Sequence, residues 1–155
     1  MQEDGALSAT EYLNENDTSL LEELTPQVIL DSNFLFIPSQ FQIDIFEELL
    51  NLLNQQFDPV LLSVTQQEIL TMAKKGSPKM RKQASLARKL AQKCRIAQVK
   101  QGKEETHDDV VVRIAQKWKC PVATNDRTLR ERLRNKGIPV IFLREKARLA
   151  LEGAL

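Results

Sequence analysis

Four acidic residues stand at similar places relative to the expected strands and helices of this 155-residue chain. Asp31 and Asp126 each follow a short apolar run, whereas Glu68 and Asp108 each lie near the start of an expected helix. Carboxylates that are packed together raise each other's pKa unless cations neutralise them. Such oxygen ligands suit Mg²⁺ or Mn²⁺, which can activate a water molecule for phosphodiester hydrolysis. The pattern therefore indicates a candidate metal-dependent hydrolytic site.

Each of these acids also has an explanation that involves no chemistry. Asp31 could simply turn the chain out of the sheet, and Asp126 could cap a helix. Glu68 and Asp109 each stand three residues after a threonine, which is the spacing of a capping box. Acids near a helix start, such as Asp108, also suit the helix dipole. His107, the only histidine, could help to position a substrate, but we expect it to be an exposed residue at a helix start. It is the four acids taken together that favour a site.

The elements that would position the acids alternate between strands and helices. Short apolar runs predict strands at 28–30, 60–64, 95–99, 121–124 and 138–142. Helices are expected at 43–56, 65–75, 78–94, 106–119, 127–136 and 144–151, and an apolar loop is expected at 34–41. This alternation predicts the α/β class, as a three-layer α/β/α fold with a central, mainly parallel sheet. Right-handed crossovers in such a sheet bring strand ends and the following helix starts to one edge, where Asp31, Glu68 and Asp126 would meet. Asp108 joins them if the strand before its helix ends on the same edge, at Val99.

The chain length fits a single domain. We expect an acidic N-terminal tail at 1–26, partly disordered or with a short helix at 18–24, then a domain at 27–149 and a C-terminal end at 150–155. There is no run of about 18 apolar residues and no secretory signal, so no membrane partner is expected. The two cysteines lack metal-like spacing and are expected to be free thiols, which favours a cytoplasmic location.

Positive and negative charges are segregated along the chain. Residues 1–73 contain 13 acidic residues and no Lys or Arg, whereas residues 74–155 contain 22 Lys and Arg and 8 acids. Within 69–103 there are 11 basic residues and no acid. An acid-free run of this length favours a polyanionic partner, and we expect RNA. The expected RNA-binding residues are Lys74, Lys75, Lys79, Arg81, Lys82, Arg88, Lys89 and Lys93.

The motifs around the acids resemble those of PIN-domain nucleases, over roughly residues 27–149. Asp31-Ser32-Asn33 after a strand is similar to the first motif of that family, and Glu68 before an isoleucine is similar to its second acid. Asp108 lies eighteen residues before the acid of Thr124-Asn125-Asp126, a spacing similar to that between the third and fourth motifs in many members. The chain looks especially similar to archaeal PIN proteins related to the ribosomal small-subunit processing nucleases, and it resembles VapC-type toxins.

This resemblance implies a parallel sheet flanked by helices and a metal-dependent endoribonuclease activity. The residues that it implies as catalytic and metal-binding are Asp31, Glu68, Asp108 and Asp126. Asp109 is an alternative third ligand because it directly follows Asp108. The residues implied to support the ligands by hydrogen bonds are Ser32, Asn33, Thr124 and Asn125. The implied cofactor is Mg²⁺ or Mn²⁺.

The leading prediction is therefore an endoribonuclease that acts on structured RNA, with ribosomal RNA precursor as the expected substrate. One alternative is the toxin of a toxin–antitoxin pair, which would have an antitoxin partner, and a homodimer is compatible with either reading. Another is a non-catalytic RNA-binding ribosome assembly factor, although a cluster of four acids costs stability when no metal is bound. A receiver-like signalling domain would need an acid at the end of its third strand, where Val99-Lys100-Gln101 stands instead.

Overall fold

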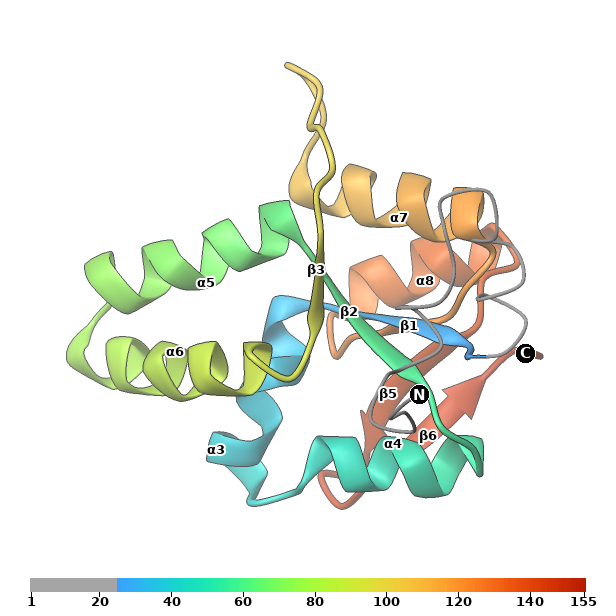
Figure 1. The fold of residues 1–155 in the computed structure, drawn as a ribbon, viewed down its shortest axis with the longest axis horizontal. Coiled ribbons are helices and arrows are strands. Elements are labelled where there is room, and N and C mark those ends of the chain that lie inside the picture. Colours follow the sequence, from blue (N-terminus) through green and yellow to red (C-terminus); the bar gives the residue numbers. More distant parts are fainter. Residues whose placement is uncertain (1–24) are drawn as a thin grey trace, which may run out of the picture.

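A six-stranded sheet with the strand order β3-β2-β1-β4-β5-β6 forms the centre of the fold (Figure 1). The computed structural model describes residues 25–155, so the helix expected at 18–24 and nearly all of the acidic tail lie outside the described residues. The first five strands run parallel, and the last is antiparallel to its neighbour. The strands are β1 (Gln27–Leu30), β2 (Asp58–Leu62), β3 (Arg95–Ala97), β4 (Val122–Ala123), β5 (Val140–Arg144) and β6 (Arg148–Glu152).

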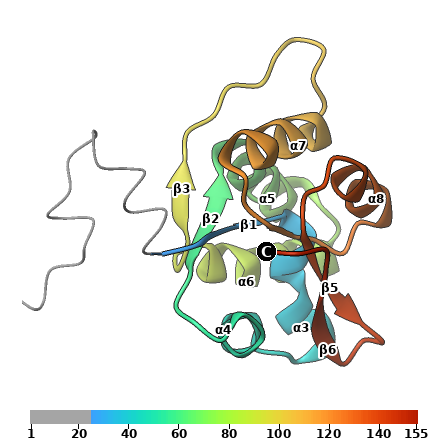
Figure 2. The ribbon, with the colours of Figure 1, turned by 90° about the vertical axis from the view of Figure 1, so that its right-hand side faces the viewer.

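Helices cover both faces of this sheet, which confirms the predicted three-layer α/β/α fold (Figure 2). They are the 3₁₀ helix η3 (Ser32–Phe36), α3 (Ile37–Phe41), α4 (Ile45–Leu53), α5 (Ser63–Lys75), α6 (Pro78–Ala91), α7 (His107–Trp118) and α8 (Arg127–Asn135). Within residues 25–155, none of these helices has the length and apolar character that a membrane span requires.

The alternation of side chains along β1 divides the core into two layers. Val28 and Leu30 face a cluster that includes η3, α4 and α6, whereas Ile29 faces a cluster that includes α7 and α8. All three side chains are fully buried, as expected for a central strand of a parallel sheet. The two layers hold β1 rigidly, so they also fix the residue that follows it.

Helices α5 and α6 pack against each other and extend beyond the sheet (Figure 1). Gly76 separates them, and the Ser77 hydroxyl accepts a hydrogen bond from the Met80 N–H at 3.2 Å. Pro78 occupies the first position of α6, where its missing N–H costs nothing. The predicted start of this helix is confirmed, although the helix ends at Ala91 rather than at residue 94.

The segment 34–41, which was predicted to be an apolar loop, is helical instead. It forms η3 and α3, and Pro38 lies in the first turn of α3, where a proline is tolerated. Phe34, Leu35 and Ile37 are buried among the residues of the layer that contains α4. The prediction of a loop was wrong because Pro38 stands at a helix start, where a proline is compatible with a helix.

The C-terminal segment 144–151 was predicted to be a helix, but it forms a turn and strand β6. Glu145 and Lys146 both have positive φ, and the chain then reverses to pair antiparallel with β5. Leu149 is buried and Leu151 packs partly buried beside it, in the layer that contains α4. Because Arg, Ala, Leu and Glu all favour helices, local propensity predicted a helix, and tertiary burial of alternate leucines overrode that propensity.

Strand β2 begins and ends earlier than predicted. It covers Asp58–Leu62, so α5 begins at Ser63. Thr65 consequently lies inside the helix and Glu68 is its sixth residue, in the second turn rather than the first. The capping-box explanation of Glu68 is therefore wrong, since Leu62 is the N-cap and no side chain caps this helix.

Candidate metal centre

Asp31 directly follows β1 at the carboxyl edge of the sheet. Its backbone N–H donates to the Ala123 carbonyl at 2.9 Å, which continues the ladder between β1 and β4. Asp31 is only 3% exposed. Its Oδ1 accepts a hydrogen bond from the Ser32 N–H at 2.9 Å, and its Oδ2 accepts one from the Asn33 amide at 3.2 Å. The residues next to Asp31 thus orient a carboxylate that is almost fully enclosed.

The Thr124 hydroxyl joins the ends of β1 and β4. It donates to Asp31 Oδ2 at 2.8 Å and accepts from the Asp126 N–H at 3.0 Å. Asn33 Oδ1 accepts from the Asn125 N–H at 2.9 Å, and Asn125 Oδ1 accepts from a backbone N–H of β5. The predicted supporting residues on these two strand ends therefore form one hydrogen-bonded network, in which Thr124 contacts Asp31 and Asn125 holds β5 in place.

Glu68 reaches the same edge from α5. The Ser32 hydroxyl donates to Glu68 Oε1 at 2.5 Å. The backbone N–H of the same serine donates to Asp31, so Ser32 links two carboxylates that are 37 residues apart in the sequence. The side chain of Glu68 is 35% exposed, which leaves it accessible to a ligand from solution.

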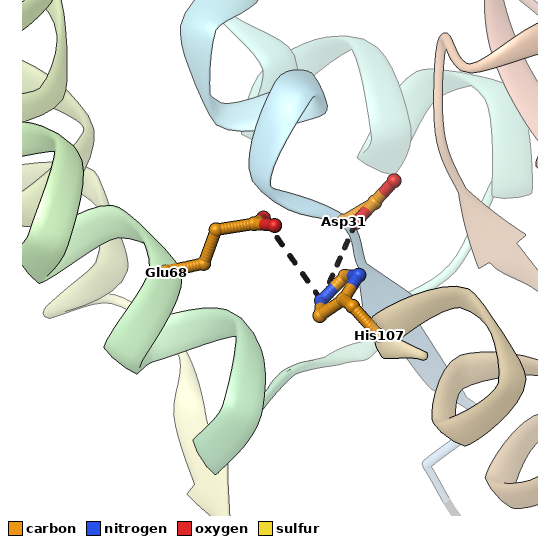
Figure 3. A group of neighbouring side chains, drawn as sticks. All are labelled: Asp31, Glu68 and His107. Carbon is orange, nitrogen blue, oxygen red and sulfur yellow. Dashed lines mark ion pairs between the residues drawn. The ribbon is translucent and has the colours of Figure 1, made fainter. Parts of the chain in front are cut away.

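His107 lies between these two acids (Figure 3). Its Nε2 is 4.0 Å from Asp31 Oδ1 and 4.0 Å from Glu68 Oε1, and the Thr65 hydroxyl lies 2.8 Å from the same nitrogen. The side chain is only 20% exposed. The prediction of an exposed helix-start residue was wrong because α7 begins beside α5 at the carboxyl edge, where its first side chain is enclosed.

These three side chains form the candidate metal centre. Asp31, Glu68 and His107 each offer one ligand atom, and the three atoms all lie within 4.8 Å of one another. Within residues 25–155 they are the one group of three or more acidic, histidine or cysteine side chains so arranged. Two carboxylates and an imidazole, supplied by the end of β1, by α5 and by α7, could hold a divalent cation.

Asp108 and Asp126 lie beside this centre rather than within that close group. Asp108 is the second residue of α7, with its Oδ1 3.6 Å from His107 Nδ1 and its side chain 30% exposed. Asp126 is the N-cap of α8, and its Oδ1 accepts from the Leu129 N–H at 3.1 Å. Its second oxygen has no hydrogen bond to residues 25–155, and its backbone is tied to Asp31 through Thr124.

Asp109 has a structural role that occupies both of its carboxylate oxygens. It completes the capping box of α7 with Thr106, as its sequence spacing indicated. Its other oxygen accepts from Arg132 at 2.8 Å. The Thr106 N–H and the Arg132 guanidinium hold the pKa of this carboxyl below its usual range. Asp109 therefore stabilises the start of α7 and its contact with α8.

Burial raises the pKa of Asp31 from the ordinary value of 3.8 to about 6. The charge of His107, the Thr124 hydroxyl and the Ser32 N–H all favour the ionised form, but they do not outweigh the loss of solvent. Repulsion from Glu68 is the smallest contribution. Enclosure, rather than repulsion between the acids, is therefore the main cause of the raised pKa.

Thr65 is a site residue that the sequence did not indicate. It is fully buried, and its hydroxyl holds His107 Nε2. The available signal was its position one turn before Ile69, on the face of α5 that packs against the sheet. A buried polar residue on an apolar face needs a partner, and here that partner is the histidine.

The eight basic residues predicted to bind RNA are all exposed on α5, α6 and the turn that follows. None of them forms an ion pair with any residue in the range 25–155, and Lys93 lies 5.3 Å above the ring of Phe46. A hollow of about 550 Å³ on this surface is lined by Lys79, Lys82 and Lys89. We call the eight residues the basic surface.

Comparisons with known proteins agree with the motif resemblance. A family model described as a PIN like domain matches residues 28–146. Ribonuclease VapC4 of Methanocaldococcus jannaschii is 29% identical over 126 residues, which cover 77% of this chain and 92% of that protein. The solved structure of the PIN domain endonuclease Utp24 matches with a TM-score of 0.66 and 27% identity, over 83% of this chain and 92% of that chain. Since the family model spans well over half of its residues, the chain belongs to the PIN-like domain family.

Proposed function

We propose that this chain is a metal-dependent endoribonuclease that hydrolyses RNA phosphodiester bonds at the candidate metal centre. The observation that carries the proposal is the enclosed approach of Asp31, Glu68 and His107 within 4.8 Å at the carboxyl edge of the sheet. Ligands of parallel α/β sheets commonly bind at this edge. Similarity to a ribonuclease and to a PIN domain endonuclease supports the same class of reaction.

The donor atoms of the centre fit a hard divalent cation, which we propose to be Mg²⁺ or Mn²⁺. Asp31 and Glu68 would hold it beside His107, and Asp108 and Asp126 are the further acids of the proposed ligand set. We leave Asp109 out of this ligand set because Thr106 and Arg132 already engage its two oxygens. When bound, such a cation lowers the pKa of a water molecule and stabilises charge on a phosphodiester.

The side chains around the cation site orient the groups that act there. Thr124 and Ser32 donate to Asp31 and keep its oxygens fixed, and Ser32 also fixes Glu68. The 2.8 Å contact between His107 Nε2 and the Thr65 hydroxyl holds the imidazole beside both acids. Because these contacts exist before a ligand binds, little reorganisation would accompany the reaction.

The basic surface would supply most of the affinity for RNA. Its eight cations have no ion-pair partners among residues 25–155, so they are available to phosphates. Lys79, Lys82 and Lys89 line one hollow, which suits a phosphate group. Contacts of this kind bind any sequence, and they would hold the RNA while the metal centre cuts it.

We further propose ribosomal RNA precursor as the substrate and the cytoplasm as the location. The resemblance of the motifs to ribosomal small-subunit processing nucleases favours this substrate. The toxin of a toxin–antitoxin pair, with a protein antitoxin, is the second candidate, and the similarity to Ribonuclease VapC4 favours it. Growth on expression separates the two candidates, because a toxin would arrest growth and a processing nuclease would not.

The experiment that tests the nuclease proposal compares Glu68→Gln with Glu47→Gln. Glu68 lies in the metal centre, whereas Glu47 is an exposed glutamate of α4 and serves as the matched control. We expect the first change to abolish Mn²⁺-dependent cleavage of a structured RNA and the second to leave it intact. Equal cleavage by the two variants would overturn the assignment of Glu68.

A further inference from the structure

A hollow of about 390 Å³ opens beside Glu68 and His107. It lies between α5 and the loop that follows β3, and its volume falls within the range of about 300–1,000 Å³ that is typical of small-ligand sites. The other lining residues that bear on its chemistry are Val64, Gln67, Met72 and Gln101. The hollow therefore adjoins the centre where the scissile phosphate would lie.

The lining of this hollow suits the uncharged part of a nucleotide. It contains no lysine or arginine, and Glu68 would repel a phosphate that entered it. Val64 and Met72 offer apolar contact, and a thioether makes favourable contacts with aromatic rings. Gln67 and Gln101 add amide groups, which recognise the hydrogen-bonding edges of bases.

Gln101 is held in place before any ligand binds. Its amide nitrogen donates to the Glu105 carbonyl at 2.7 Å. Arg113 in turn donates to both oxygens of the Glu105 carboxylate, at 2.8 and 3.0 Å, and to the Lys100 carbonyl at 2.6 Å. These bonds fix the loop, and they leave Gln101 Oε1 without a hydrogen-bond partner among residues 25–155. A fixed acceptor binds a ligand at a smaller entropic cost.

We propose that this hollow, which we call the base pocket, binds one nucleobase of the RNA beside the scissile phosphate and favours a base with an exocyclic amino group. The free group of Gln101 is an acceptor, and an exocyclic amine is the donor that it matches. The inference rests on the proposed function for its substrate, but it concerns recognition rather than cleavage, so it can be tested separately.

The test measures binding in chelator, where no metal-dependent cleavage occurs. Fluorescence anisotropy compares a pentamer of adenosine with a pentamer of purine riboside, which differ only in the amino group. We expect the parent protein to bind the adenosine pentamer more tightly, by about two- to tenfold, as one neutral hydrogen bond predicts. The difference should disappear in Gln101→Leu. It should persist in the control Gln116→Leu, because Gln116 is an exposed residue near the end of α7 that lies away from His107.

Equal binding of the two pentamers by the parent protein would overturn the base pocket, and so would a difference that persists in Gln101→Leu. Because that change also removes the bond to Glu105, circular dichroism should show that the variant remains folded. If Gln101→Leu is not folded, Gln67→Leu replaces it, because Gln67 lines the same hollow and is exposed. This change should weaken binding of the adenosine pentamer, and unchanged binding would overturn the base pocket. Failure to cleave RNA would refute the nuclease proposal and leave these binding results standing.

Discussion

Replacement of Asp31 by asparagine should benefit the stability of the metal-free protein more at neutral than at acidic pH. Burial raises the pKa of this carboxyl to about 6, so the folded chain binds its proton more tightly than the unfolded chain does. The proton therefore stabilises the folded chain fully at pH values below 3.8, which is the pKa of the carboxyl in the unfolded chain. This stabilisation is lost as the pH rises to about 6, the pKa in the folded chain. Above that range the ionised, enclosed carboxylate costs about 3 kcal/mol. Asparagine keeps the shape of the side chain and carries no charge, but its amide nitrogen cannot accept the hydrogen bonds that one carboxylate oxygen receives. This loss is the same at every pH, so the removed charge is seen in the pH dependence.

The assay is urea unfolding in chelator at a series of pH values between 4 and 8. The free energy of unfolding of Asp31→Asn, relative to that of the parent, should increase by about 2.5 kcal/mol from pH 4 to pH 8. Asp44→Asn is the matched control, because Asp44 is an exposed N-cap and asparagine caps about as well. Parallel curves for Asp31→Asn and the parent would refute the account of an enclosed carboxylate.

Further predictions concern the network, a thiol, the basic surface and the N-terminal segment. Thr124→Val should lower the free energy of unfolding by about 1–3 kcal/mol, because Asp31 and the Asp126 N–H each lose a partner, and Thr124→Ser should restore most of it. Burial, with a smaller effect of Asp58, raises the pKa of Cys94 to about 12, so iodoacetamide at pH 8 should modify this thiol much more slowly in the folded than in the unfolded chain. Deletion of 1–17, which lies outside the described residues, should leave the unfolding midpoint nearly unchanged. Replacement of four lysines by glutamine should weaken RNA binding; they are Lys79, Lys82, Lys89 and Lys93. The slope of log affinity against log salt should become shallower by about 0.7 per lost phosphate contact, and an unchanged slope would locate the RNA elsewhere.

Much of the fold could be predicted because one or more helices separate most successive strands along the chain. The apolar run at 28–30 predicted β1. In a parallel sheet, ligands bind at the carboxyl ends of the strands, and this is where Asp31 lies. The C-terminal hairpin could not be predicted in this way. Its residues favour helices locally, and only the burial of Leu149 and Leu151 beside α4 selects a strand.

The candidate site was predictable where its residues follow strands and less so where they lie on helices. Asp31 and Thr124 are fixed by strand ends that meet. His107 depends on how α7 approaches α5, and a sequence contains no direct signal for that approach. The role of Asp109 could be predicted although it lies on a helix, because its spacing from Thr106 is that of a capping box. Its neighbour Asp108 does not share this structural role.

Cleavage of a structured RNA by the parent protein, by Asp31→Asn and by Asp44→Asn tests the central claim most directly. The rates are measured in Mn²⁺ and in chelator, beside the melting temperature of each protein. We expect cleavage by the parent and by Asp44→Asn in Mn²⁺ only. We expect none by Asp31→Asn, whose melting temperature should also rise less on addition of Mn²⁺. Full cleavage by Asp31→Asn, or equal cleavage by the parent in chelator, would contradict it.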